Sequence, residues 1–175
     1  MGSPAVVLLS GGLDSTVLLH YVAKRLKRTP VFALSFRYGQ KHDRELAMAR
    51  WQASQLPEVA EHIELDIGFF QELVGGSAAL VHGGPEIPDL SALRDGERDQ
   101  PPTYVPNRNM VLLALAASCA EGRGCEDVYY GAQAQDEYGY WDCTPDFLER
   151  INAVFALNRR TPVTVHAPFV NKKKS

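Results

Sequence analysis

The residues 10–16, Ser-Gly-Gly-Leu-Asp-Ser-Thr, have the types expected of a phosphate-binding loop. They follow the apolar run 5–9 and precede a helical apolar pattern over 15–27. Glycines let the backbone approach an anion closely and adopt positive φ. The first amides of a helix lack partners inside it and lie at its positive end. We therefore expect the loop to bind phosphate through Ser10, Gly11, Gly12, Leu13, Ser15 and Thr16.

The loop lacks the Gly-Lys-Ser/Thr ending of a Walker sequence and the third glycine of a dinucleotide fingerprint. One alternative is a glycine-rich turn in which Ser15 only caps the helix. The full run resembles instead the PP-loop of ATP pyrophosphatases, which split ATP into AMP and pyrophosphate. That resemblance implies that Asp14 helps to hold Mg²⁺.

A second polar run, Phe-Arg-Tyr-Gly-Gln-Lys-His over 36–42, comes at the end of a predicted strand, 31–36. Aromatic and amide side chains at that edge suit a base or a ribose. We expect Phe36, Tyr38 and Gln40 to contact the nucleotide. The alternative is a simple strand-to-helix turn in which Gly39 provides backbone freedom.

A third run, Tyr-Val-Pro-Asn-Arg-Asn over 104–109, precedes an almost wholly apolar helix, 110–120. Asn107 can cap that helix, which brings Arg108 near its positive end. A guanidinium there suits bidentate binding of a carboxylate or phosphate. The alternative is an ordinary surface arginine.

The fourth run, 131–147, alternates aromatic side chains with amides and carboxylates. Aromatic faces can hold a planar ring between them, and one carboxylate can accept from the adjacent N–H and amino groups of a guanine-like ring. Candidates for this pocket are Gln133, Tyr138, Tyr140, Asp142 and Asp146, with the two aspartates reading the ring. The alternative is a loop whose aromatic residues pack on the core.

These runs need elements to bring them together, and the pattern alternates between strand and helix. It predicts strands over 5–9, 31–36, 62–67, 128–131 and 164–167, and helices over 15–27, 43–56, 110–120 and 147–157. Such alternation favours an α/β fold: a doubly wound, Rossmann-like parallel sheet of about five strands with helices on both faces. Ligands of such sheets bind beyond the carboxyl ends of the strands. We expect one domain, 1–175, with a flap or insertion over the Gly- and Pro-rich 75–103.

Composition narrows the class of substrate and the compartment. The chain has 18 Lys and Arg against 21 Asp and Glu, a net charge of −3, which disfavours nucleic acid and favours a small molecule. Its three cysteines show no C-x₂-C spacing of a zinc or redox site, and so few cysteines suggest a reducing compartment. No stretch reads as a signal sequence or a membrane span, so we expect a cytoplasmic protein.

Taken together, the four runs resemble the 7-cyano-7-deazaguanine synthase family (QueC), over about 5–174. The resemblance implies conversion of 7-carboxy-7-deazaguanine and ammonia into the 7-cyano compound, through an adenylated carboxylate and an amide, with ATP and Mg²⁺. By position, Asp14, Arg108 and Lys174 would be catalytic, and Tyr138, Tyr140, Asp142 and Asp146 would line the deazaguanine pocket. A homodimer is also implied. The family's glycine in the third run is Asn107 here, a residue that also visits left-handed conformations.

The family also carries a four-cysteine zinc-binding tail. This chain ends at 171–175, and Cys119, Cys125 and Cys143 are too scattered to replace that tail. We expect a truncated chain or a shortened variant. Alternatives are another PP-loop enzyme, a related ligase that stops at the amide or uses another amine, and a non-catalytic nucleotide-binding module.

Overall fold

The computed structural model describes residues 2–38, 43–74, 104–133 and 140–171. Its centre is a sheet of five parallel strands in the order β3-β2-β1-β4-β5. The strands are β1 (Ala5–Leu8), β2 (Val31–Arg37), β3 (Val59–Asp66), β4 (Asp127–Tyr129) and β5 (Thr164–His166). The inner strands β1 and β2 are mostly apolar, as is typical of strands that helices cover on both faces.

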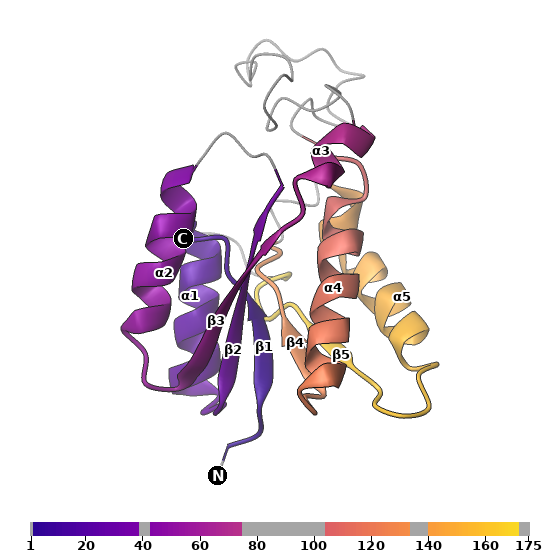
Figure 1. Cartoon of the computed structure of the whole chain (residues 1–175). Coiled ribbons are helices and arrows are strands. Elements are labelled where there is room, and N and C mark those ends of the chain that lie inside the picture. The colour runs from indigo at the N-terminus through magenta and orange to yellow at the C-terminus, as the bar shows by residue number, and fades with distance from the viewer. Residues whose placement is uncertain (1, 39–42, 75–103, 134–139, 172–175) are drawn as a thin grey trace.

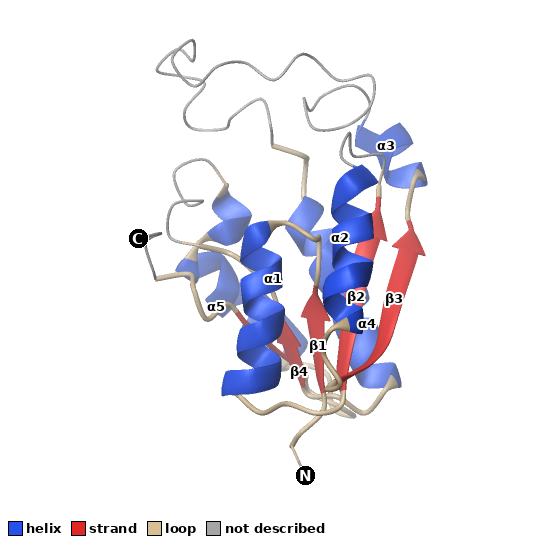
Figure 2. Cartoon of the chain, turned by 90° about the vertical axis from the view of Figure 1, so that its left-hand side faces the viewer, coloured by secondary structure: helices blue, strands red, loops and turns tan. Residues whose placement is uncertain are grey.

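The helices form two layers, one on each face of the sheet (Figure 1). One layer contains α1 (Leu13–His20) and α2 (Asp43–Ser54), and the other contains α4 (Arg108–Gly122) and α5 (Pro145–Phe155). The short helix α3 (Phe69–Val74) follows β3, and a single 3₁₀ turn, Trp141–Cys143, precedes α5. Figure 2 shows α1 and α2 in front of the strands. The doubly wound fold expected from the sequence is confirmed.

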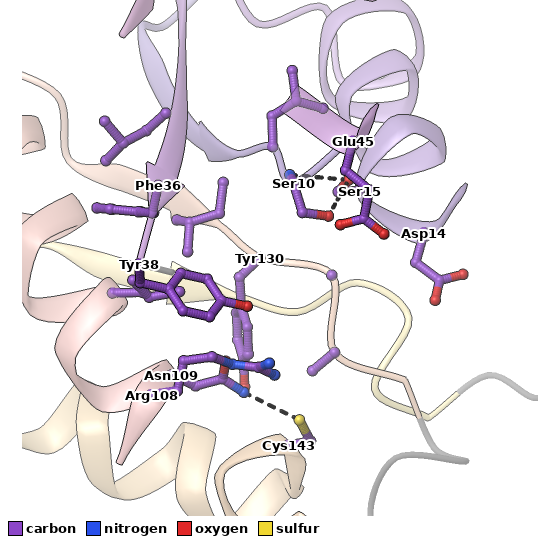
Figure 3. A pocket seen from close by; sticks show the side chains of 16 residues that line it. Ser10, Asp14, Ser15, Phe36, Tyr38, Glu45, Arg108, Asn109, Tyr130 and Cys143 are labelled. Atoms are coloured by element: carbon purple, nitrogen blue, oxygen red, sulfur yellow. Dashed lines mark hydrogen bonds between the residues drawn. The ribbon is translucent and has the colours of Figure 1, made fainter. Parts of the chain in front are cut away.

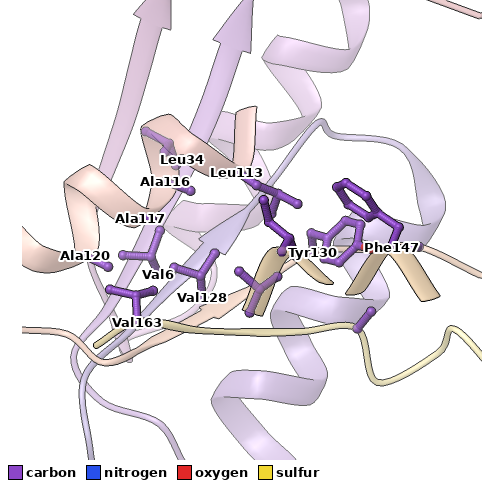
Figure 4. Close-up of a cluster of buried hydrophobic side chains, with 14 of the residues drawn as sticks. Val6, Leu34, Leu113, Ala116, Ala117, Ala120, Val128, Tyr130, Phe147 and Val163 are labelled. Atoms are coloured by element: carbon purple, nitrogen blue, oxygen red, sulfur yellow. The ribbon is translucent and has the colours of Figure 1, made fainter. Parts of the chain in front are cut away.

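Each layer has its own hydrophobic cluster. On the α4 side, Leu113, Ala116 and Ala120 recur at helical spacing and pack against Val6 and Val128 of the sheet (Figure 4). The alanines let the α4 backbone lie close to the strands. On the opposite face, alternate residues of β1 such as Val7 pack among the buried side chains of α1 and α2.

Local signals explain where the second layer's helices begin. Asn107 adopts a left-handed conformation, with φ 53°, directly before α4, as its replacement of a glycine led us to expect. Thr144 caps α5, because its Oγ1 accepts from the Phe147 N–H at 3.1 Å. Pro145 occupies the first helical position, where its missing N–H costs nothing.

Three differences from the sequence expectation exceed two residues. The helix expected over 15–27 ends as an α-helix at His20 and continues as a wider π-helical turn, Tyr21–Arg25. Strand β3 begins at Val59, three residues early, beyond a register shift against Val31 and Phe32. Helix α3 was not expected. The segment 75–103, for which we expected a flap, lies outside the described residues.

Strand β3 is one edge of the sheet and carries ion pairs on both faces. Arg50 of α2 bonds Glu64 on one face. On the other face, Arg123 Nη2 lies 3.0 Å from Glu61 Oε2, just after α4. Within the described ranges, no helix is long and apolar enough to cross a membrane.

Candidate active site

A cleft of about 380 Å³ opens at the carboxyl ends of β1, β2 and β4. Here β1 lies between β2 and the later strand β4. The connections that follow β1 and β4 therefore leave the sheet in opposite directions, and ligands of such sheets bind in the crevice between them. Figure 3 shows the loop residues Ser10 and Ser15, with Glu45, on one side, and Tyr38, Arg108, Asn109 and Cys143 on the other. The remaining lining residues are Leu8, Leu9, Asp14, Leu34, Phe36, Leu112, Tyr130, Gly131 and Ala132.

The phosphate loop is folded around the Ser15 hydroxyl. Ser15 Oγ accepts from the N–H groups of Ser10 and Gly11, each at 3.2 Å, and donates to the Gly12 carbonyl at 3.0 Å. The first intrahelical bond of α1 is Thr16 N–H to Gly12 O, at 3.0 Å. The backbone amides of residues 13–15 therefore lie at the positive end of α1, a position that suits an anion. Ser15 is buried in the wall of the cleft, where its hydroxyl holds the loop, and its contact with phosphate stays a prediction.

Gly11 lets the start of α2 pack directly on this loop. Its φ is +91°, and a Cβ placed there would lie 1.9 Å from the Glu45 carbonyl oxygen. The close approach brings Glu45 to the cleft beside Asp14. Sequence reasoning missed Glu45. Its signal was its position in the first turn of the helix that follows β2.

Arg108 forms part of the opposite wall. Burial favours loss of its proton, but the Tyr38 side chain, which hydrogen-bonds to it, and the nearby Asp142 and Cys143 raise the pKa above its ordinary value. The guanidinium is therefore permanently charged and faces the cleft across from the phosphate loop. The structure brings Arg108, Tyr38 and Phe36 together with the loop, as the sequence led us to expect.

Asp142 is placed differently from the expectation. It is 2% exposed and is absent from the cleft lining described above. Its Oδ2 accepts from the Asn109 backbone N–H at 3.2 Å, in the first turn of α4, while Asn109 Nδ2 donates to Cys143 Sγ at 3.2 Å. Burial raises the pKa of Asp142, against the opposing effects of the Asn109 N–H and Arg108. Asp142 therefore binds the start of α4 next to Arg108.

The other candidates from the fourth run are dispersed. Gln133 is buried two residues after Gly131, and Tyr140 is half-buried beside Tyr104, with ring centroids 6.5 Å apart. Asp146 is exposed on α5 and paired with Arg150 at 2.9 Å. Gln40, Tyr138 and Lys174 lie outside the described residues. Besides Glu45, sequence reasoning missed Tyr130, Asn109 and Cys143 as cleft residues, although Tyr130 follows the end of a strand, where ligands bind.

Solved structures establish the class of fold. The U34-tRNA thiolase NcsA from Methanococcus maripaludis superimposes with a TM-score of 0.54 and 11% identity, over 98% of this chain and 53% of the thiolase. A predicted tRNA methyltransferase subunit from Methanocaldococcus jannaschii gives 0.54 and 13%, over 98% of this chain and 70% of the subunit. At such identities the likeness concerns the fold alone.

The sequence comparisons identify the family. The family model described as "Queuosine biosynthesis protein QueC" matches residues 4–175. A 7-cyano-7-deazaguanine synthase from Magnetococcus marinus is 42% identical over 98% of this chain and 73% of its own length. The synthase from Archaeoglobus fulgidus is 39% identical, over 98% of this chain and 68% of its own length. The chain belongs to the QueC family, whose members named here are enzymes.

Proposed function

We propose that this chain is an ATP-dependent ligase that converts 7-carboxy-7-deazaguanine and ammonia into 7-cyano-7-deazaguanine, releasing AMP and pyrophosphate. The observation that carries the proposal is the arrangement of one cleft: a helix-start phosphate loop on one wall and the Arg108 guanidinium on the other. The synthases of the same family that match along nearly the whole chain support the choice of substrate.

The chemistry needs both walls. A carboxylate is a poor electrophile because its leaving group would be oxide or hydroxide. Attack of the carboxylate on the α-phosphorus of ATP gives an acyl adenylate and pyrophosphate. Ammonia then displaces AMP to give the amide. The amide oxygen then attacks the α-phosphorus of a second ATP, which releases a second pyrophosphate and one N–H proton. Loss of AMP and of the remaining N–H proton gives the nitrile.

The residues of this chain act mainly by position and charge. The amides at the start of α1 bind the phosphate oxygens, on which negative charge develops as pyrophosphate leaves. Arg108 holds the substrate carboxylate against the α-phosphate, and Tyr38 orients the guanidinium. Phe36, whose ring lines the same cleft, provides apolar surface for a planar ring. No side chain has to act as a covalent nucleophile.

A magnesium ion fits the donor set of the loop wall. Asp14 and Glu45 line the cleft beside the loop hydroxyls, and Mg²⁺ is commonly held by one or two carboxylates together with substrate phosphates. Bound there, the ion would neutralise charge on the departing pyrophosphate. For zinc, the described residues contain no group of three His, Cys, Asp or Glu able to hold an ion.

The test is substrate-dependent release of AMP and pyrophosphate from MgATP, with the product identified by mass after reaction with ¹⁵N-ammonium. We expect AMP release only with 7-carboxy-7-deazaguanine, and the mass of the ¹⁵N-nitrile. The mass of the amide alone would make the chain an amide-forming ligase. No substrate-dependent AMP release would refute the proposal.

Arg108→Ala provides the matched test of the site. Loss of a charge-assisted bond of about 1.5–3 kcal/mol predicts at least a tenfold fall in kcat/KM for the carboxylate substrate. Arg150→Ala is the control, because that exposed arginine pairs only with Asp146 on the surface of α5 among the described ion pairs. Full turnover by Arg108→Ala would remove Arg108 from the mechanism.

A further inference from the structure

Tyr130, the residue after β4, has an unpaired hydroxyl in the wall of the cleft. The side chain is 5% exposed and its ring lines the cleft. Among the buried side-chain oxygen and nitrogen atoms of the described residues, the Tyr130 Oη is the one that lacks a hydrogen-bond partner. A buried hydroxyl with no partner is unfavourable, so a group that supplies an acceptor would relieve a cost already present in the fold.

The neighbours of this hydroxyl already have partners of their own. Asp142 Oδ2 accepts from the Asn109 N–H, and Cys143 Sγ accepts from the Asn109 side chain. Burial, and after it the nearby Cys143 and Asp142, raise the pKa of Tyr130 above its ordinary value. The phenol is therefore neutral at physiological pH, with a proton to donate.

The ring extends from the end of β4 toward Asn109 and Cys143, away from Ser10 and Ser15 (Figure 3). It therefore points toward the wall that carries Arg108 and away from the Ser10 and Ser15 side chains. The hydroxyl is covered as well as unpaired, so a ligand must displace part of this wall, or draw the ring outward, to reach it.

We propose that Tyr130 is a positioning residue whose hydroxyl donates a hydrogen bond to the heteroaromatic carboxylate substrate, and not to ATP. The inference rests on the proposed function and adds to it a donor for an oxygen or ring nitrogen of the substrate. Arg108 provides a charged contact to the carboxylate, and Tyr130 provides a neutral, directional hydrogen bond from the same wall of the cleft.

Tyr130→Phe removes only the hydroxyl, and Tyr129→Phe is its matched control. Tyr129 is the last residue of β4, directly before Tyr130, and is also buried. It packs on the opposite face of the sheet, where its ring stacks on that of His166 with the centroids 4.7 Å apart. The experiment measures the dissociation constants of ATP and of 7-carboxy-7-deazaguanine separately by calorimetry. Urea unfolding of each ligand-free variant is measured in parallel.

For Tyr130→Phe we expect substrate affinity to fall by about 3- to 30-fold with the affinity for ATP unchanged, the range of one lost hydrogen bond. We also expect the ligand-free variant to be at least as stable as the parent chain, because no bond is lost in that state. Tyr129→Phe should leave both affinities unchanged.

Three outcomes would overturn the inference. Equal substrate affinity in Tyr130→Phe and the parent chain would show that the hydroxyl does not meet the substrate. Reduced stability with both affinities lowered would indicate a structural role. If the parent chain itself binds no 7-carboxy-7-deazaguanine, the proposed function fails together with this inference, whereas the first two outcomes leave the proposed function standing.

Discussion

Ser15 and Asp142 illustrate how buried polar groups prepare the two walls of the cleft. Ser15 Oγ uses the amides of Ser10 and Gly11 to hold the loop in shape before any ligand arrives. Asp142 accepts from the start of α4 and lies near Arg108. Neither residue needs to touch a ligand to matter, because each holds a group for which we propose a ligand contact.

The raised pKa of Asp142 predicts a specific pH dependence of stability. Because burial favours the protonated form in the folded state, the contribution of Asp142 is complete below its ordinary pKa and is lost as the pH rises through the raised value. The free energy of unfolding of the parent chain minus that of Asp142→Asn should therefore decrease from pH 4 to pH 7. The expected size is about 1.4 kcal/mol for each unit of pKa difference.

Urea titrations at both pH values provide the measurement, with Asp146→Asn as the control for loss of one carboxyl at an exposed position. A pH-independent difference between the parent chain and Asp142→Asn would show that the carboxyl titrates alike in the folded and unfolded chains.

The candidate site was predictable to the extent that its residues follow strands. The loop 10–16, Phe36, Tyr38 and Arg108 were predicted because their types and their places after strands or before a helix indicate an anion site. Asp142 and Asp146 could not be placed in the same way. Whether a loop carboxylate points into a cleft, toward a helix start or into solvent depends on tertiary packing, and these two point elsewhere. Glu45 required knowledge that α2 packs on Gly11.

At the scale of elements, the contact of α2 with the phosphate loop depends on one glycine. Gly11→Ala would place Cβ 1.9 Å from the Glu45 carbonyl oxygen at a φ of +91°. Left-handed strain of about 1–2 kcal/mol and overpacking of about 1–3 kcal/mol should both destabilise the fold. The shift of α2 should also weaken ATP binding.

Gly12→Ala is the matched control, one residue away. Gly12 has an extended backbone with φ −71°, and the nearest atom to an added Cβ is the Ser10 hydroxyl at 3.5 Å. Chemical denaturation and ATP calorimetry on both variants test the comparison. Equal effects of the two substitutions would show that the Glu45 contact does not set the loop.

Sequence periodicity predicted the order and type of the main elements but not all of their ends. The apolar runs of β1 and β2 and the Ala- and Leu-rich pattern of α4 are strong local signals that agree with the fold. The π-helical turn at Tyr21–Arg25 could not be predicted, because a single wider turn is too short to show a periodicity of its own. Strand β3 is mostly polar or half-buried, as an edge strand is, so its start was missed.

At the scale of the whole molecule, MgATP should stabilise the folded chain. MgATP bound only by the folded state would raise the free energy of unfolding by about 2.7 kcal/mol at 100 times its dissociation constant. If Asp14 holds the ion, ATP with EDTA should stabilise Asp14→Asn as much as it stabilises the parent chain. Most of the additional stabilisation that Mg²⁺ gives the parent chain should be lost in Asp14→Asn. Thermal unfolding with and without Mg²⁺ gives both values. The same Mg²⁺ increment in Asp14→Asn would assign the ion to other ligands.

The ion pairs on β3 bear on how copies of this chain behave at high concentration. An edge strand offers unpaired backbone groups to any extended segment, and charged side chains are a common protection against such pairing. Glu61 with Arg123 and Glu64 with Arg50 place charge on both faces of this edge. A foreign strand that extended the sheet would have to strip water from both pairs. We therefore expect the residues that neutralise one another within a single chain to disfavour fibrous aggregation as well.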